Sequence, residues 1–65
     1  MQKLLLTETE TGEVTGFSRS TLRKLWAQGE LQPVRVGRSI RYVTEDVEAF
    51  VARLREDAYA RRSTR

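Results

Sequence analysis

The sequence contains no cysteine and no histidine, and these absences exclude several kinds of chemistry. Without cysteine no disulfide can form, and without both residues the usual ligands of a zinc site are missing. Nucleophilic catalysis of the Cys/His or Ser/His kind is also excluded. No apolar run approaches the roughly 20 residues of a membrane span, and no signal peptide precedes the domain. We therefore expect a cytoplasmic protein that is not an enzyme, with no metal or other cofactor and no membrane contact.

The chain is also short. Its 65 residues make one small domain, and a domain of this size has a stability of no more than roughly 3–5 kcal/mol. We expect a single domain over residues 1–59 and a flexible basic C-terminal tail over residues 60–65. The arginines of this tail, Arg61, Arg62 and Arg65, are either idle or a nonspecific binding arm.

Charge is distributed unevenly along the chain, although the net charge is only +3. Between residues 17 and 42 there are six cations and one anion, whereas the remaining residues hold six cations and eight anions. A generic scaffold would have a more neutral surface. A basic centre within an acidic frame indicates a polyanionic partner.

Residues 18–28, SRSTLRKLWAQ, have the features of a short amphipathic helix. Ser18 is a good N-cap, and Gly29 is a typical helix stop. Leu22, Leu25 and Trp26 share one apolar face, so we interpret Trp26 as a core residue rather than a base-stacking one. The other faces carry hydroxyl and cationic side chains: Arg19, Ser20, Thr21, Arg23 and Lys24.

Another helix is expected directly before this one. Thr7 and Glu10 form a capping box, and Gly16 ends the helix. Its apolar side is thin, mainly Val14 with Thr11 and Gly12, so packing against the next helix must hold it. Gly12 either permits a close approach of the two helices or is a tolerated weakness.

Two helices joined by a short glycine-containing turn indicate a helix-turn-helix, whose second helix enters the DNA major groove. There arginine can pair with guanine, and serine or threonine can reach bases or phosphates. The alternative is that this cationic helix face is merely solvated.

Residues 34–42, VRVGRSIRY, predict a two-stranded hairpin with a turn at Gly37. Its apolar side chains should face inward and Arg35 and Arg41 outward. Together with Arg38 and Ser39 they would contact phosphates, as the wing of a winged helix does; the alternative is that the arginines only block strand pairing at an exposed edge. Whether the tip enters the minor groove or follows the backbone stays open.

A third helix should begin at a Thr44 cap and continue to about Tyr59. Its apolar residues recur at helical spacing: Val47, Phe50, Val51 and Leu54. Acidic residues gather near its start, and we interpret them as capping and solubility charges rather than a metal or acid–base site: Glu45, Asp46 and Glu48. The predicted fold is mainly α with a small β-hairpin, a winged helix-turn-helix in the order α-α-β-β-α.

The ordered run from the leucines before Thr7 to Leu54 resembles the excisionase family of small MerR-like winged helix-turn-helix proteins. The resemblance is carried by GFSRSTLRKLWAQGELQPVRVGRSIRYVTEDVEAFV at residues 16–51, and its most specific stretch is GELQPVRVGRSIRY. The chain departs from the family in the first helix, where Thr11, Gly12 and Thr15 stand in place of the usual alanines and leucines.

This resemblance implies a phage or mobile-element protein that acts in a bacterial host cell as a recombination directionality factor. Such proteins bind repeated sites in attachment DNA, bend the DNA and help a phage integrase to excise, while catalysing nothing themselves. Carried onto this chain, the second helix would read the major groove with Ser18, Arg19, Ser20, Thr21, Arg23 and Lys24. The hairpin residues Arg35, Arg38, Ser39 and Arg41 would hold the adjacent minor groove and backbone.

Relatives with the same motif regulate transcription, so a small transcriptional regulator is the first alternative. An adaptor that contacts an integrase and barely touches DNA is the second. One module of this size should bind double-stranded DNA weakly at physiological salt, with nonspecific dissociation constants of about 10⁻⁴ to 10⁻⁶ M. We therefore expect cooperative self-association on DNA, with residues 54–65 supplying the protein–protein contact.

Overall fold

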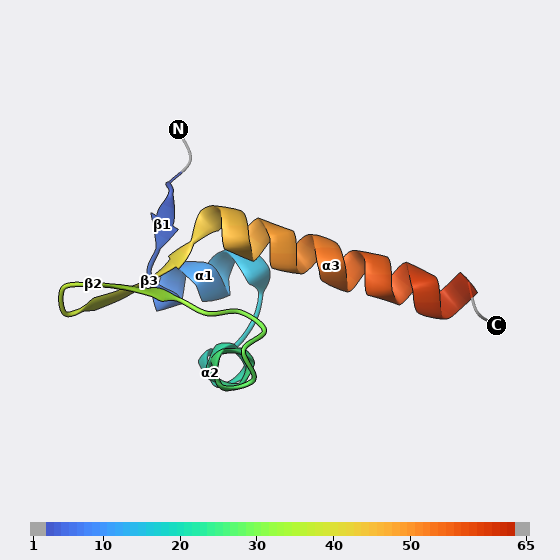
Figure 1. Cartoon of the computed structure of the whole chain (residues 1–65), viewed down its shortest axis with the longest axis horizontal. Helices are drawn as coiled ribbons and strands as arrows, with labels where there is room; N and C mark the ends of the chain where they lie inside the picture. Colours follow the sequence, from blue (N-terminus) through green and yellow to red (C-terminus); the bar gives the residue numbers. More distant parts are fainter. Residues whose placement is uncertain (1–2, 64–65) are drawn as a thin grey trace.

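The computed structural model describes residues 3–63. They form, in order, β1 (Leu5–Leu6), α1 (Glu8–Thr15), α2 (Arg19–Ala27), β2 (Val34–Val36), β3 (Ser39–Val43) and α3 (Thr44–Ser63). The strands make one antiparallel sheet in the order β1-β3-β2 (Figure 1). The predicted winged helix-turn-helix and its α-α-β-β-α order are confirmed. The sequence interpretation missed β1, whose Leu6 pairs with Tyr42 and is buried.

Threonines hold the poorly helical sequence of α1 in place. The capping box is present, because the Thr7 hydroxyl accepts from the Glu10 N–H at 3.0 Å and the Glu10 carboxylate accepts from the Thr7 N–H at 2.9 Å. Thr11 is fully buried, and its hydroxyl donates to the Thr7 carbonyl at 2.8 Å. The Thr15 hydroxyl accepts from the Phe17 N–H at 3.2 Å and so satisfies a donor of the turn. These bonds replace the apolar packing that the helix lacks.

The contact between α1 and α2 depends on Gly12. A Cβ atom at this position would lie 3.0 Å from the Phe17 carbonyl oxygen and 4.0 Å from Leu22 Cδ1. Of the two interpretations of Gly12, close approach is therefore the correct one. Val14, which was expected to supply the apolar contact, is 65% exposed, and that expectation is wrong. Thr11, which was expected on the same side of the helix, is the residue that is buried.

The core lies where α2, α3 and the sheet meet. Its buried residues are Leu6, Leu22, Leu31, Tyr42, Val47 and Phe50, with Phe17 and Leu25 packed against them. Trp26 is not a member of this cluster, so the expectation that it is a core residue is wrong. It is half-buried, and the guanidinium carbon of Arg23 lies 6.0 Å from the centre of its ring. The expected place of Tyr42 in the core is confirmed.

Helix α3 begins and ends differently from the prediction. The Thr44 hydroxyl donates to the Lys3 carbonyl, and its N–H donates to the Leu4 carbonyl at 2.9 Å. Thr44 therefore ties α3 to the N-terminal segment as the first helical residue rather than capping the helix from outside. The helix also runs past Tyr59 to Ser63, so most of the expected tail is helical, and residues 64–65 lie outside the described part.

The second half of α3 projects from the body of the molecule (Figure 1). With this helix included, the molecule measures 47 × 29 × 16 Å. Val47 and Phe50 are buried, as their spacing predicted, but Val51 and Leu54 are 43% and 42% exposed. The apolar stripe of the helix therefore extends beyond the core that it covers. No helix among the described residues is both long enough and apolar enough to cross a membrane.

The hairpin has a register that the sequence interpretation did not foresee. The three cross-strand pairs are Val34 with Arg41, Arg35 with Ile40, and Val36 with Ser39. Because directly opposed residues lie on the same face of an antiparallel ribbon, Arg35 shares the face of Ile40, and Arg41 shares the face of Val34. The two arginines thus lie on opposite faces, and both valines of β2 are exposed. The turn has two residues. A shift of one residue in register would move the side chains of one strand to the other face of the ribbon relative to its partner.

Candidate nucleic-acid interface

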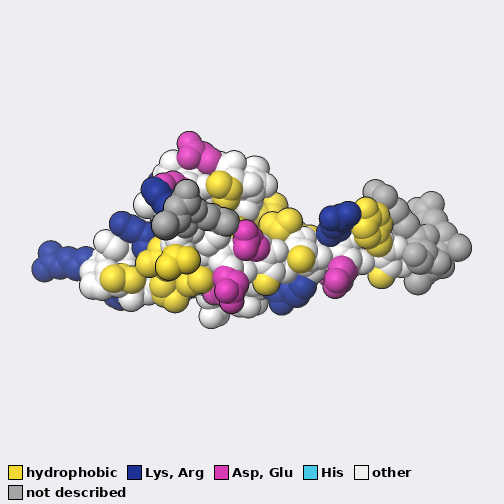
Figure 2. Space-filling view, turned by 90° about the horizontal axis from the view of Figure 1, so that it is seen from above, with side chains coloured by type: hydrophobic (Ala, Val, Ile, Leu, Met, Phe, Trp, Pro, Cys, Tyr) yellow, Lys and Arg dark blue, Asp and Glu magenta, His cyan; other side chains and the backbone are white. Residues whose placement is uncertain are grey.

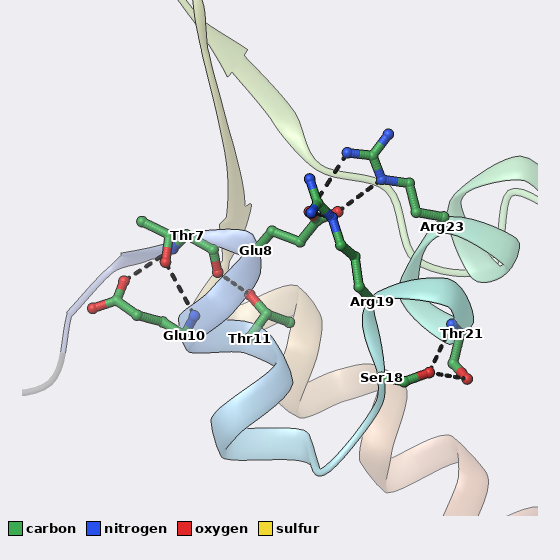
Figure 3. A network of polar contacts seen from close by, with 8 residues as sticks. All are labelled: Thr7, Glu8, Glu10, Thr11, Ser18, Arg19, Thr21 and Arg23. Atoms are coloured by element: carbon green, nitrogen blue, oxygen red, sulfur yellow. Dashed lines mark hydrogen bonds and ion pairs between the residues drawn. The ribbon is translucent and has the colours of Figure 1, made fainter.

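The N-terminus of α2 is fixed by hydroxyl groups. Ser18 has extended backbone angles, and its side chain accepts from the Thr21 N–H at 3.2 Å, which confirms the predicted N-cap. The Ser18 hydroxyl also donates to Thr21 Oγ1 at 3.0 Å (Figure 3). Ser18 is therefore engaged as a cap, whereas the Thr21 hydroxyl hydrogen remains available to a base or a phosphate.

Two predicted site residues, Arg19 and Arg23, converge on one carboxylate of the neighbouring helix. Arg19 Nε donates to Glu8 Oε1 at 2.9 Å, and Arg23 Nε donates to Glu8 Oε2 at 3.0 Å. Arg23 Nη2 lies 3.5 Å from Glu8 Oε1. Figure 3 shows the two guanidinium groups side by side, with Glu8 reaching them from α1. The side chains of Arg19 and Arg23 remain 76% and 54% exposed, against 23% for Glu8.

Glu8 is the residue of this site that the sequence interpretation missed. It is an acidic residue in the first turn of α1, where a carboxylate suits the helix dipole. Its partners lie 11 and 15 residues further along the chain, and no local pattern joins them. The signal available in the sequence was an acidic residue at the start of one helix and two arginines spaced four apart on the next.

Ser20 and Lys24 occupy a different sector of α2, one position round the helix from the two arginines. Both are exposed. The side chain of neither residue makes a hydrogen bond or ion pair to any other residue that the structure describes. The predicted cationic face of α2 therefore has two parts. One is the pair of arginines bonded to Glu8, and the other is a lysine and a serine whose side chains have no partner among the described residues.

Tyr42 of β3 is buried within range of the charges of Glu8 and Arg23. The residue is 1% exposed, and its hydroxyl has no hydrogen-bond partner within residues 3–63. Burial raises the pKa of this phenol, the charge of Glu8 raises that pKa further, and the charge of Arg23 lowers it. The phenol is therefore neutral at physiological pH. The apolar pattern of the hairpin predicted its burial but not the effect of Glu8 and Arg23 on its hydroxyl.

The hairpin carries the remaining predicted site residues. Arg35, Arg38 and Ser39 are exposed, and Arg41 is half-buried, with Nη1 donating to the Ile40 carbonyl at 2.9 Å. The turn depends on Gly37, which has a φ of 62°. The hairpin projects at the end of the molecule opposite the C-terminus (Figure 1), and Figure 2 shows cationic side chains at that end.

The exposed groups of this site are suited to binding anions. Among residues 3–63 there is no cluster of acidic side chains that could hold a metal ion. What the described residues provide is cationic and hydroxyl side chains on one short exposed helix and on a projecting ribbon. Charges of this kind attract phosphates, and guanidinium groups on a helix can reach base edges. The assignment of individual residues to DNA contacts stays a prediction.

The sequence model of one protein family, described as a helix-turn-helix domain, matches residues 5–55, which is most of the chain. The matched span includes α1, the turn, α2, the hairpin and the buried part of α3. Comparison with curated proteins and with solved structures found no match.

Proposed function

The chain belongs to the helix-turn-helix domain family, a DNA-binding family that includes excisionase-like proteins, and we propose that it is a recombination directionality factor of the excisionase type. In this role it binds and bends the DNA of an attachment site and helps an integrase to excise. The observation that carries the proposal is the combination of an exposed arginine pair on α2 with an arginine-bearing hairpin in one small chain.

On DNA, α2 lies in the major groove. Its N-terminal part is presented outward, so Arg19, Ser20 and Arg23 reach base edges while Lys24 contacts a phosphate. The neutral Tyr42 phenol lies too deep to take part directly. Sequence preference then comes from the arginines, because a guanidinium can donate two bonds to guanine.

The hairpin register supports insertion of the wing into the minor groove. Arg35 and Arg41 lie on opposite faces of the ribbon. A ribbon lying flat on the backbone would use only one of them. A ribbon entering a groove edge-on presents one arginine to each wall, and both walls of the minor groove are lined by phosphates. Arg38 at the tip then lies deepest.

The projecting part of α3 fits a second copy of the chain bound at an adjacent site. Val51, Leu54 and Tyr59 are 42–52% exposed along it. The same segment carries charges of both signs, Arg53, Arg55, Glu56 and Asp57 among them. A surface meant for DNA would be uniformly basic, whereas mixed charges around apolar residues suit contact with an identical helix. Cooperative binding then compensates for the weak affinity of one module.

The test is a titration of the protein against a labelled fragment carrying the attachment region beside its own gene, at several salt concentrations. A random fragment of equal length is the control. Tight, cooperative retardation of the attachment fragment that weakens steeply with salt is the expected result, followed by excision in an assay with the integrase. Equal retardation of both fragments would contradict the excisionase role. Retardation of a promoter fragment instead would indicate a transcriptional regulator.

A further inference from the structure

Glu8 makes contacts that a helix-dipole charge does not need. Its two carboxylate oxygens accept from the Nε atoms of Arg19 and Arg23 at 2.9 and 3.0 Å, and this joins α1 to the DNA-facing side of α2 (Figure 3). The bonds use the inner edge of each guanidinium group. Apart from the longer contact of Arg23 Nη2 with Glu8, the terminal nitrogens make no hydrogen bond to the described residues. Both arginine side chains are more than half exposed.

The local charge follows from this geometry. Two guanidinium groups four residues apart on a helix repel each other, and a carboxylate between them removes the repulsion. It also lowers the charge of the pair from two to one. A phosphate therefore meets a weaker attraction here than at two free arginines, because nonspecific affinity depends on the number of cations that displace counterions.

Holding the two side chains has a second consequence. A free arginine loses rotamer freedom when it binds a base, whereas an arginine already fixed by a hydrogen bond loses less. The end of the Arg23 guanidinium that points away from Glu8 still has the paired donors that suit guanine. Glu8 thus disfavours loose phosphate contacts and favours contacts with a fixed geometry.

We propose that Glu8 is a positioning residue that sets the sequence specificity of the DNA interface, acting through Arg19 and Arg23. This inference rests on the DNA binding proposed above, though not on the excisionase role. Glu8 itself contacts neither a base nor a phosphate. Its removal should strengthen binding to DNA of any sequence and weaken the preference for one sequence over another.

The test compares Glu8→Gln with the wild type and with Glu13→Gln. Glu13 is exposed on the same helix and makes no ion pair to a described residue, so its variant loses the same charge without disturbing the arginines. A preferred duplex is first selected by the wild-type protein from a randomised pool. The affinities of all three proteins for this duplex and for a random duplex are then measured at several salt concentrations.

For Glu8→Gln we expect about a threefold to tenfold gain in affinity for the random duplex, and a salt slope steeper by about one unit. The affinity for the preferred duplex should change little, so that the ratio of the two affinities falls by about threefold to tenfold, at most the value of one well-placed base contact. Glu13→Gln should leave this ratio unchanged. In the free protein, Glu8→Gln should also shift the NMR signals of the Nε protons of Arg19 and Arg23.

Two failures can be told apart. If Glu8→Gln behaves like Glu13→Gln in affinity, salt slope and ratio, the inference is wrong while DNA binding stands. If the wild-type protein retards no duplex at any salt concentration, the proposed function fails, and the inference with it. Thermal unfolding of each variant checks that the comparison is made on folded protein, since Glu8 lies outside the hydrogen bonds of the capping box.

Discussion

Replacing Gly12 by alanine should destabilise the protein, although the same change stabilises most helices. In an open helix alanine is favoured over glycine by about 1 kcal/mol. Here the new Cβ would lie 3.0 Å from the Phe17 carbonyl oxygen, so the backbone of the turn must move by a few tenths of an ångström. Overpacking of this kind costs about 1–3 kcal/mol. The net result is a loss of about 1 kcal/mol in the free energy of unfolding.

The loss should be easy to measure, because in a domain of this length 1 kcal/mol corresponds to roughly 4–8 °C in Tm. Thermal unfolding followed by circular dichroism is the assay. Phe17 directly precedes the N-cap of α2, so a shift of its carbonyl also tilts the helix that carries the arginines. Binding to a preferred duplex should therefore weaken more than binding to a random one.

Glu13→Ala is the matched control. It changes the next residue of the same helix, which is exposed, and its effect should stay within about 0.5 kcal/mol. A rise in Tm for Gly12→Ala of the size seen for a glycine in an open helix would refute the close approach of α1 to the turn. Loss of DNA binding without any loss of stability would also contradict the expected clash between the new Cβ and the Phe17 carbonyl.

Three other predictions concern binding and stability. Arg23→Ala should cost about 1–3 kcal/mol in binding to a preferred duplex and relax the preference at one base, as measured by competition with single-base variants. Arg41→Ala should weaken binding to all duplexes alike and flatten the salt slope by about one unit; a change confined to one sequence would contradict a phosphate contact. Tyr42→Phe should leave the Tm unchanged or raise it, because it removes a buried hydroxyl that has no partner among the described residues.

A further prediction concerns pH. The hydrogen bond that Lys3 donates lowers the pKa of Glu10 in the folded protein most, and the hydrogen bond from the Thr7 N–H lowers this pKa further. A lowered folded-state pKa contributes stability above the carboxyl's ordinary pKa, and this contribution is lost as the pH falls through the folded-state value. Glu10→Gln keeps the capping bond but loses the ion pair. Its Tm should therefore lie below the wild type at pH 7 and converge with it towards pH 3, and a difference that persists at pH 3 would contradict the charge as the cause.

The elements of the fold could be predicted because their signals are local. The Ser18 cap, the Thr7 and Glu10 capping box and the glycine stops each act within four residues, and all of them appear in the structure. The period-two pattern of the hairpin is local too. Its register was not predictable in this way, because one residue more or less in the turn would place Arg35 and Arg41 on the same face.

The parts of the site that sequence reasoning missed depend on contacts between distant segments. Glu8 meets its arginines across the contact between α1 and α2, where Gly12 lets α1 lie close to the turn before α2. Trp26 has the spacing of a core residue, but the core is already filled by Leu22 and Leu25 on that helix. Val14 is likewise exposed, whereas the smaller Thr11 is the residue of α1 that is buried. Periodicity identifies an apolar face without saying how far the opposing element extends.

The most direct test of the central claim, that the arginine pair of α2 binds DNA, is the salt dependence of binding to a random duplex. A double variant, Arg19→Ala with Arg23→Ala, is compared with Arg53→Ala with Arg55→Ala, which removes the same charge from α3. We expect the first variant to weaken binding and to flatten the salt slope by about one to two units, and the second to leave the slope close to that of the wild type. Equal slopes for the two variants would contradict the claim, because binding would then depend on net charge and not on the exposed face of α2.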